Sequence, residues 1–152
     1  MSFKKLWLSL LFCSALAQAQ AQQARAFSIF LDCSDFYCDQ DFYRTELAFV
    51  NHVRERTAAD VHVLVTQQGT GGGGRQYSLA FYGQLRFAGI SDTLTSSTPQ
   101  GATEDEQRQV IARTVRMGLV RYLARTPDGP RVAISLDSAK TGAAVTAAPR
   151  DP

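Results

Sequence analysis

Metal-ligating residues are scarce in this chain of 152 residues, which contains 2 histidines and 3 cysteines. A structural zinc site needs four ligands at close spacing, whereas His52 and His62 show no paired spacing that would focus a metal. The aspartates between Asp32 and Asp41 lack the D-x-D-x-D-G order and the distal glutamate of a calcium loop. We therefore expect no metal ion and no cofactor.

Motifs of known catalytic sites are also missing. No Gly-x-Ser-x-Gly occurs, and neither histidine lies in a recognisable catalytic motif. The glycine-rich segment Gly69–Gly74 leads into Arg75-Gln76-Tyr77 and not into the Gly-Lys-Ser/Thr of a phosphate-binding loop. A flexible hairpin tip explains these glycines better. We expect no catalytic residues, and an exported hydrolase-like enzyme is the alternative.

Only one apolar run is long, from Leu6 through Ala17, and it is too short to cross a bilayer core of about 30 Å. Lys4 and Lys5 precede it, and small-residue triplets such as Ala24-Arg25-Ala26 follow it. This pattern is typical of a secretory signal peptide, which we assign to residues 1–26. We expect an exported protein, periplasmic or associated with the outer membrane, without a transmembrane helix in the mature chain.

A net positive charge is absent once this leader is removed. The chain carries 16 basic and 14 acidic residues, and three of the basic ones (Lys4, Lys5 and Arg25) lie in the leader, which has no acidic residue. Cleavage after Ala26 therefore changes the formal charge from +2 to −1. A weakly acidic chain has no field that attracts phosphate backbones, so we expect no nucleic-acid partner.

Two cysteines, Cys33 and Cys38, remain in the mature chain. In an oxidising compartment such a pair is expected to form a disulfide that closes a short loop. A thioredoxin-like site has two intervening residues, not four, and a zinc site needs two further ligands. A small redox or metal-binding protein that uses this pair is the remaining alternative.

The first half of the mature chain alternates between strand and helix patterns. Phe27–Asp32 is a short apolar run that predicts a buried strand. Asp41–Arg56 has apolar residues at helical spacing, acidic residues at its start and arginines at its end, which predicts a helix. In Val61–Thr66 the valines alternate with His62, Leu64 and Thr66, which predicts a strand.

The second half predicts a β-meander followed by a helix. Tyr77–Phe87 alternates large and small residues, and with Val61–Thr66 it would form a long hairpin around the glycines. Asp92–Ser97, rich in serine and threonine, predicts a third strand at a sheet edge. Thr103-x-x-Glu106 is a capping box that opens a helix ending before Pro127, and Arg131–Asp137 could add a strand.

The predicted order is thus β-α-β-β-β-α. It indicates an α+β sandwich with one antiparallel-rich sheet and two helices on one face. The predicted domain spans 27–127, and residues 128–152, rich in alanine, proline, serine and threonine, are expected to form a flexible tail or linker.

This layout resembles small α+β domains of bacterial envelope proteins, such as the amino-terminal domain of the Tol system's periplasmic propeller protein and the periplasmic domain of the curli secretion channel. Three segments are more closely similar to an uncharacterised family of exported Gram-negative envelope proteins: Phe49–Thr66 (FVNHVRERTAADVHVLVT), the glycine hairpin, and Gly118–Pro127 (GLVRYLARTP). Members of that family often continue into an outer-membrane β-barrel, and the resemblance carries no catalytic assignment. It implies an envelope protein or an outer-membrane β-barrel as the partner.

We therefore expect a binding or assembly module of the cell envelope. The candidate binding residues are His62, Arg75, Tyr77 and Tyr82. An exposed apolar patch or an open strand edge would favour this module. A pocket that joins Asp60 and His62 with strongly shifted pKa values would favour the enzyme.

Overall fold

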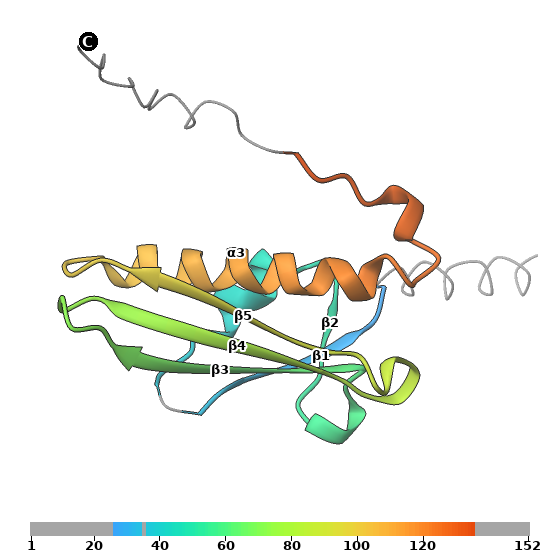
Figure 1. The fold of residues 1–152 in the computed structure, drawn as a ribbon. Helices are drawn as coiled ribbons and strands as arrows, with labels where there is room; N and C mark the ends of the chain where they lie inside the picture. Colours follow the sequence, from blue (N-terminus) through green and yellow to red (C-terminus); the bar gives the residue numbers. More distant parts are fainter. Residues whose placement is uncertain (1–25, 35, 136–152) are drawn as a thin grey trace, which may run out of the picture.

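The structure, a computed structural model, describes residues 26–34 and 36–135. Figure 1 shows the elements in chain order: β1 (Ser28–Cys33), α2 (Gln40–Glu46), β2 (Asn51–His52), β3 (Val61–Gly69), β4 (Arg75–Gly83), β5 (Ser91–Thr98) and α3 (Glu104–Leu123). Short 3₁₀ turns lie at η1 (Arg56–Ala58), η2 (Leu85–Phe87) and η3 (Gly129–Arg131). Nearly all of the predicted signal peptide, 1–25, and residues 136–152 of the predicted tail lie outside the described residues.

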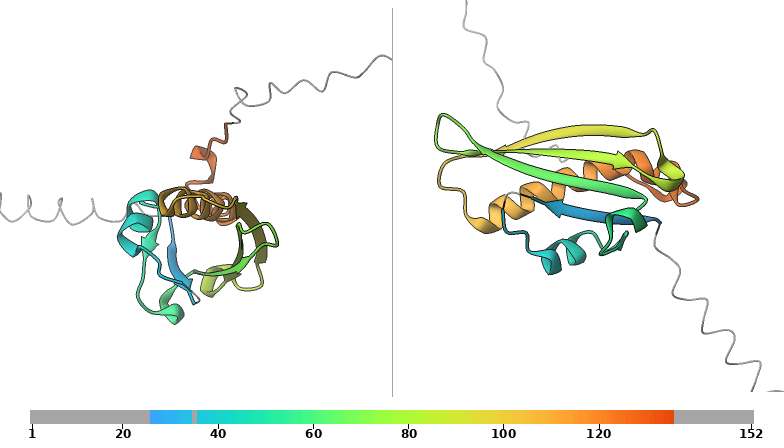
Figure 2. Two further views of the ribbon diagram at one scale, coloured as in Figure 1. Left: turned by 90° about the vertical axis from the view of Figure 1, so that its left-hand side faces the viewer. Right: turned by 90° about the horizontal axis from the view of Figure 1, so that it is seen from below.

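The five strands form one mixed sheet in the order β2-β1-β3-β4-β5. β1 pairs in parallel with both β2 and β3, and the longer pairings of β3 with β4 and of β4 with β5 are antiparallel. The predicted α+β class with an antiparallel-rich sheet and two helices is confirmed. Figure 2 (right) shows α3 behind the strands, so that the opposite sheet face is turned toward the viewer.

The core lies between this sheet and the helices. Strand alternation places Val61, Val63 and Val65 on the helix side, where all three are fully buried. α2 reaches the same core through Tyr43. The apolar stripe of α3 also faces it and comprises Ile111, Val115, Leu119 and Tyr122. We call the sheet face turned away from both helices the uncovered face.

α3 begins at the predicted capping box. The Thr103 hydroxyl accepts a hydrogen bond from the Glu106 backbone N–H at 3.2 Å, and the Glu106 carboxylate accepts one from the Thr103 N–H at 2.7 Å. These two bonds satisfy helix-terminal donors that have no partner within the helix. The predicted start, and an end before Pro127, are both confirmed.

The predicted helix Asp41–Arg56 is wrong in its second half. α2 ends at Glu46, and the chain then forms the short strand β2 beside β1. The backbone N–H of Asn51 donates to Phe27 O at 2.8 Å, and that of Val53 donates to Ile29 O at 3.0 Å. The free side of β1 therefore supplies hydrogen-bond partners that replace those of a longer helix.

Two strand predictions also need correction. The strand predicted to run to Phe87 ends at Gly83, because the chain turns there through η2. A side chain at Gly83 would collide with the backbone oxygens of Phe87 and Ile90, so only glycine fits this turn. Of the strand proposed for Arg131–Asp137, the described residues 131–135 form none.

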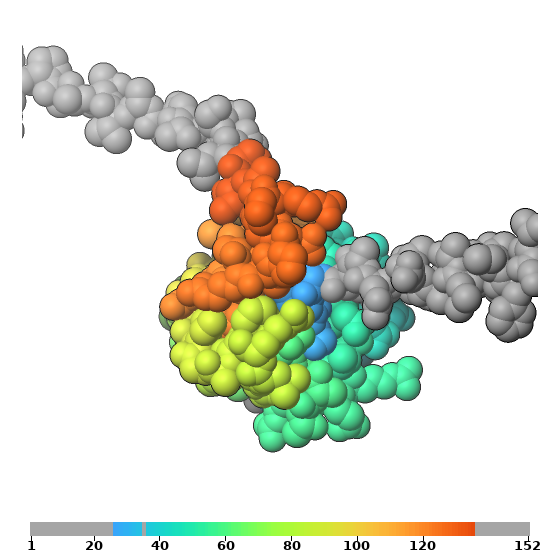
Figure 3. All heavy atoms as spheres, turned by 90° about the vertical axis from the view of Figure 1, so that its right-hand side faces the viewer, coloured from blue at the N-terminus to red at the C-terminus, as the bar shows by residue number. Residues whose placement is uncertain are grey.

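β1 starts and α3 ends at the same end of the domain (Figure 1). Figure 3 looks onto this end, where the first residues of β1, in blue, lie beside the end of α3, in orange. The β3–β4 hairpin tip and the start of α3 lie at the opposite end. Within the described residues, no helix combines the length and the apolar character needed to cross a membrane.

Candidate functional site

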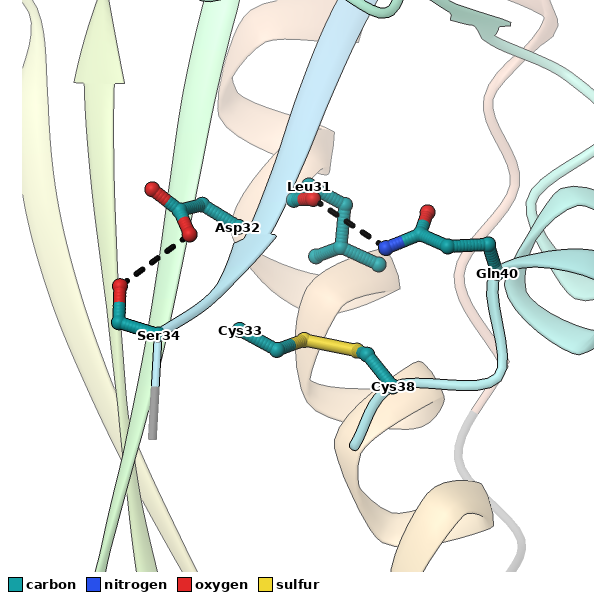
Figure 4. The surroundings of a disulfide bond; sticks show 6 residues. All are labelled: Leu31, Asp32, Cys33, Ser34, Cys38 and Gln40. Carbon is teal, nitrogen blue, oxygen red and sulfur yellow. Dashed lines mark hydrogen bonds between the residues drawn. A yellow bond between two sulfur atoms is a disulfide. The ribbon is translucent and has the colours of Figure 1, made fainter. Parts of the chain in front are cut away.

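A disulfide loop connects β1 to α2 (Figure 4). Cys33 and Cys38 are joined through their sulfur atoms, with their Cα atoms 5.9 Å apart. The side-chain amide of Gln40 also donates to Leu31 O at 3.5 Å. Both contacts connect the start of α2 to the last residues of β1. They therefore restrain the two aromatic residues within the loop, Phe36 and Tyr37.

These aromatic residues form one wall of a cleft with a volume of about 300 Å³, which we call the loop cleft. It lies between the disulfide loop, the start of α3 and the adjoining ends of β3 and β4. Its aromatic lining comprises Phe36, Tyr37, Tyr43 and Tyr77. Tyr37 is 90% exposed, whereas Tyr43 and Tyr77 are buried. The cleft thus has an open aromatic rim over a closed aromatic floor.

The remaining lining is mostly polar: Asp39, Gln67, Arg75, Glu104, Gln107 and Arg108. The Tyr77 hydroxyl donates to Gln107 Oε1 at 3.1 Å, which joins β4 to α3 across the cleft. The Arg75 guanidinium donates to Gln67 Oε1 at 3.0 Å. These bonds hold the amide and guanidinium planes at defined positions along the cleft.

Asp39 has two structural roles beside the cleft. One carboxylate oxygen accepts from the Phe42 N–H at 3.1 Å and caps α2, and the other accepts from Arg108 at 3.3 Å. Arg108 also stacks over the Phe42 ring, and its pKa is raised mainly by a hydrogen bond to Asp105. Burial raises the pKa of Tyr43 to about 12, so this phenol stays protonated near neutral pH.

A second group of aromatic residues lies on the uncovered face. Phe30, His62 and Tyr82 occupy neighbouring positions on β1, β3 and β4. The His62 ring centroid is 5.5 Å from that of Phe30 and 5.7 Å from that of Tyr82. His62 is 7% exposed and Tyr82 is 43% exposed. We call these three residues the aromatic row.

Asp32 lies beside the aromatic row and contacts two groups. Its carboxylate oxygens lie 3.3 Å from His62 Nε2 and 3.2 Å from the Ser34 hydroxyl. In a serine hydrolase the histidine lies between the carboxylate and the serine, because it must remove the serine proton. Here the carboxylate lies between the other two, and the Ser34 hydroxyl donates to the carboxylate instead of to the histidine. This order does not activate a nucleophile.

Asp60 does not join His62 in a pocket but forms a separate structural contact. It accepts from the Ser28 N–H at 2.8 Å and from two nitrogens of Arg86 at 3.1 and 3.0 Å. Burial alone would raise the pKa of Asp60, but the hydrogen bonds from Arg86 and Ser28 outweigh it and the pKa is lowered. Arg86 also donates to Ala26 O, so these contacts fasten the start of β1 to the turn after β4.

The four candidate binding residues separate into two pairs. His62 and Tyr82 meet in the aromatic row, whereas Arg75 and Tyr77 line the loop cleft on the helix side. Sequence reasoning missed Tyr37 and Arg108 as cleft residues. The Phe36-Tyr37 pair between two cysteines was a usable signal, because a short closed loop holds such side chains at the surface. No sequence pattern pointed to Arg108, because its position at the cleft depends on how α3 packs.

Among the residues that the structure describes, no three histidine, cysteine, aspartate or glutamate side chains are placed to hold a metal ion. No known family model matches the chain. A comparison with curated proteins also found no match.

Proposed function

We propose that this protein is an exported binding or assembly module of the cell envelope that acts without catalysis. It binds an envelope protein or an outer-membrane β-barrel through the uncovered face of its sheet. The observation that carries this proposal is the aromatic row, Phe30, His62 and Tyr82, on a face that neither α2 nor α3 covers.

The aromatic row has the composition of an interface centre. Aromatic residues are enriched where proteins bind each other, and tyrosine often dominates the binding energy. Tyr82 is the exposed member of the row, and the buried His62 ring packs against it. Leu64 and Ala80 lie beside the row in the next register position and extend its apolar surface. Tyr82 is 43% exposed, and burial of this remaining surface would contribute about 2 kcal/mol to binding.

Polar residues surround this centre, as they do in protein interfaces. Hydroxyl side chains follow along the same face toward the hairpin tip: Thr66, Ser78, Thr93 and Thr95. On the same face, on the side of the aromatic row away from the hairpin tip, Asp60 and Arg86 form an ion pair at 3.0 Å. An apolar centre with a hydrogen-bonding rim suits a folded protein partner better than a small apolar ligand.

Two contacts favour binding over catalysis. Asp32 contacts His62 but also accepts the Ser34 hydroxyl, so His62 is not placed to remove the Ser34 proton. Asp60 is held by Arg86 and Ser28 and shares no hydrogen bond with His62 in the described part of the chain. The leader pattern and the Cys33–Cys38 pair support the proposed exported location. Protein from envelope fractions should begin between residues 18 and 27. Folded, released protein that still begins with Met1 would contradict export.

Photo-crosslinking in the source cells tests the docking face. A photoreactive phenylalanine analogue placed at Tyr82 should give one discrete adduct with an envelope protein. The matched control is the same analogue at Met117, a large apolar residue on α3 that is 64% exposed. We expect no such adduct at Met117. Equal adducts at both positions, or none at Tyr82, would contradict the proposal.

A further inference from the structure

We propose that the loop cleft is a second binding site, independent of the uncovered face, and that its ligand is a short neutral oligosaccharide. The proposal rests on the exposed Tyr37 of the disulfide-closed loop, which lies across the cleft from planar polar side chains of β3, β4 and α3.

The loop cleft is spatially separate from the aromatic row. Tyr77 points to the helix side of the sheet, whereas its neighbours Gln76 and Ser78 point to the uncovered face. The cleft also lies at the hairpin end of the domain, opposite the end where β1 starts and α3 ends (Figure 1). A ligand in the cleft would leave the uncovered face accessible.

The size of the cleft suits a small ligand. Its volume of about 300 Å³ is at the lower end for ligand pockets. A space of this size holds only the end of a longer chain, whose further rings would extend into solvent past the exposed rim.

Aromatic side chains provide the apolar contacts that a sugar ring needs. The face of an aromatic ring carries partial negative charge and attracts the weakly positive C–H groups on one face of a sugar. Tyr37 presents such a face with 90% exposure, on a loop that the Cys33–Cys38 bond closes. The disulfide limits the backbone freedom of this loop, and a tyrosine side chain has few rotatable bonds, so ordering it against a ligand costs little conformational entropy.

The polar lining offers both donors and acceptors, as vicinal hydroxyls require. Arg75 donates only to the neutral Gln67 and has no carboxylate partner in the described part of the chain. Glu104 makes no side-chain hydrogen bond with any described residue, so both of its oxygens can accept. The Tyr77 hydroxyl, which donates to Gln107, can still accept a hydrogen bond. These groups suit a ligand that both donates and accepts.

The charges of the cleft lining favour a neutral ligand over an anion. Asp39 and Glu104 balance Arg75 and Arg108, so the lining residues that the structure describes carry no net charge. Arg108 is in addition committed to Asp39 and Asp105 at 3.3 and 2.7 Å. A phosphate site would require unpaired positive charge or converging backbone N–H groups. A wholly apolar ligand would leave Arg75 and Glu104 desolvated without a charged partner.

Chemical-shift titration of the disulfide-intact mature protein tests the site. The probes are three neutral tetrasaccharides, cellotetraose, chitotetraose and maltotetraose, with inorganic phosphate as the anionic comparison. We expect saturable shifts for at least one tetrasaccharide at concentrations up to about 10 mM, centred on residues of the cleft. Tyr37→Ala, at an exposed position, should weaken that binding at least about tenfold.

The matched controls are Tyr82→Ala in the aromatic row and Arg113→Ala on the exposed surface of α3, and both should leave saccharide binding unchanged. No saturable shift with any tetrasaccharide would overturn the proposal, as would preferential binding of phosphate. An equal loss of affinity with Tyr82→Ala would also overturn it. The crosslinking result at Tyr82 is independent of this titration, so either proposal can fail while the other stands.

Discussion

Gly118 is the position at which the packing of α3 on the sheet can be tested most sharply. A Cβ atom at residue 118 would fall well inside van der Waals contact with the ring of Phe81 on β4. Phe81 is fully buried, so its ring has no solvent-filled space into which to move. Gly118→Ala therefore has two opposing effects on stability: it favours the helix and it overpacks the core.

The two effects have different sizes. Replacing glycine by alanine within a helix stabilises it by about 1 kcal/mol. Inserting a methyl group into a well-packed core costs about 1 to 3 kcal/mol, and contact with several ring atoms places this site near the upper value. We expect a net destabilisation of about 2 kcal/mol, which lowers the Tm of a domain of this size by roughly 10 °C.

Urea and thermal unfolding measure this change. Met117→Ala is the matched control, because residue 117 is 64% exposed on the same helix and should shift stability by no more than about 0.5 kcal/mol. Phe81→Leu removes the ring atoms that meet residue 118, so Gly118→Ala should cost at least about 1 kcal/mol less in that background. If Gly118→Ala equals or exceeds the parent protein in stability, the close packing of α3 on Phe81 is refuted.

Three further predictions concern stability. Leu119→Ala, at a fully buried position of α3, should cost about 2 to 5 kcal/mol in urea unfolding; a cost near zero would place Leu119 outside the core. The pKa of Asp60 is lowered in the folded protein, so its charge stabilises the fold fully above the ordinary pKa of about 4. This stabilisation is lost as the pH falls toward the folded pKa. Asp60→Asn should therefore make the urea midpoint fall less steeply below about pH 5. An unchanged acid slope would show that Asp60 contributes nothing through its charge. Reduction of the Cys33–Cys38 pair should add two hydrogens to the intact mass and cost about 2 kcal/mol; two freely alkylated thiols in native exported protein would contradict the pairing.

Local signals in the sequence determined the elements that carry their own hydrogen-bond partners. Thr103 and Glu106 cap α3 through bonds that span only three residues, so the start of this helix could be predicted without any knowledge of the rest of the fold. The alternation in β3 and β4 likewise predicted which residues share a face of the sheet. Val61 and Phe81 lie on the buried face, because a strand turns every second side chain to the same side.

The segment after Glu46 was decided by the tertiary structure. Apolar residues at helical spacing continue past that point, but the backbone of Asn51 and Val53 pairs with β1 instead. The pattern of apolar residues is the same whether the segment packs as a helix or pairs as an edge strand. The segment becomes an edge strand because folding places the unpaired side of β1 beside it.

Both candidate sites also depend on contacts between segments far apart in the chain. The sequence alone determined that His62, Tyr82 and Tyr77 lie on strands, and alternation assigned Tyr77 and Tyr82 to opposite faces. It could not place Phe30 beside His62, because that depends on parallel pairing across a crossover. The loop cleft likewise required α3 to pack against the disulfide loop and β4. Local patterns are set by hydrogen bonds and burial within a few residues, whereas the sites arise from the register and packing of whole elements.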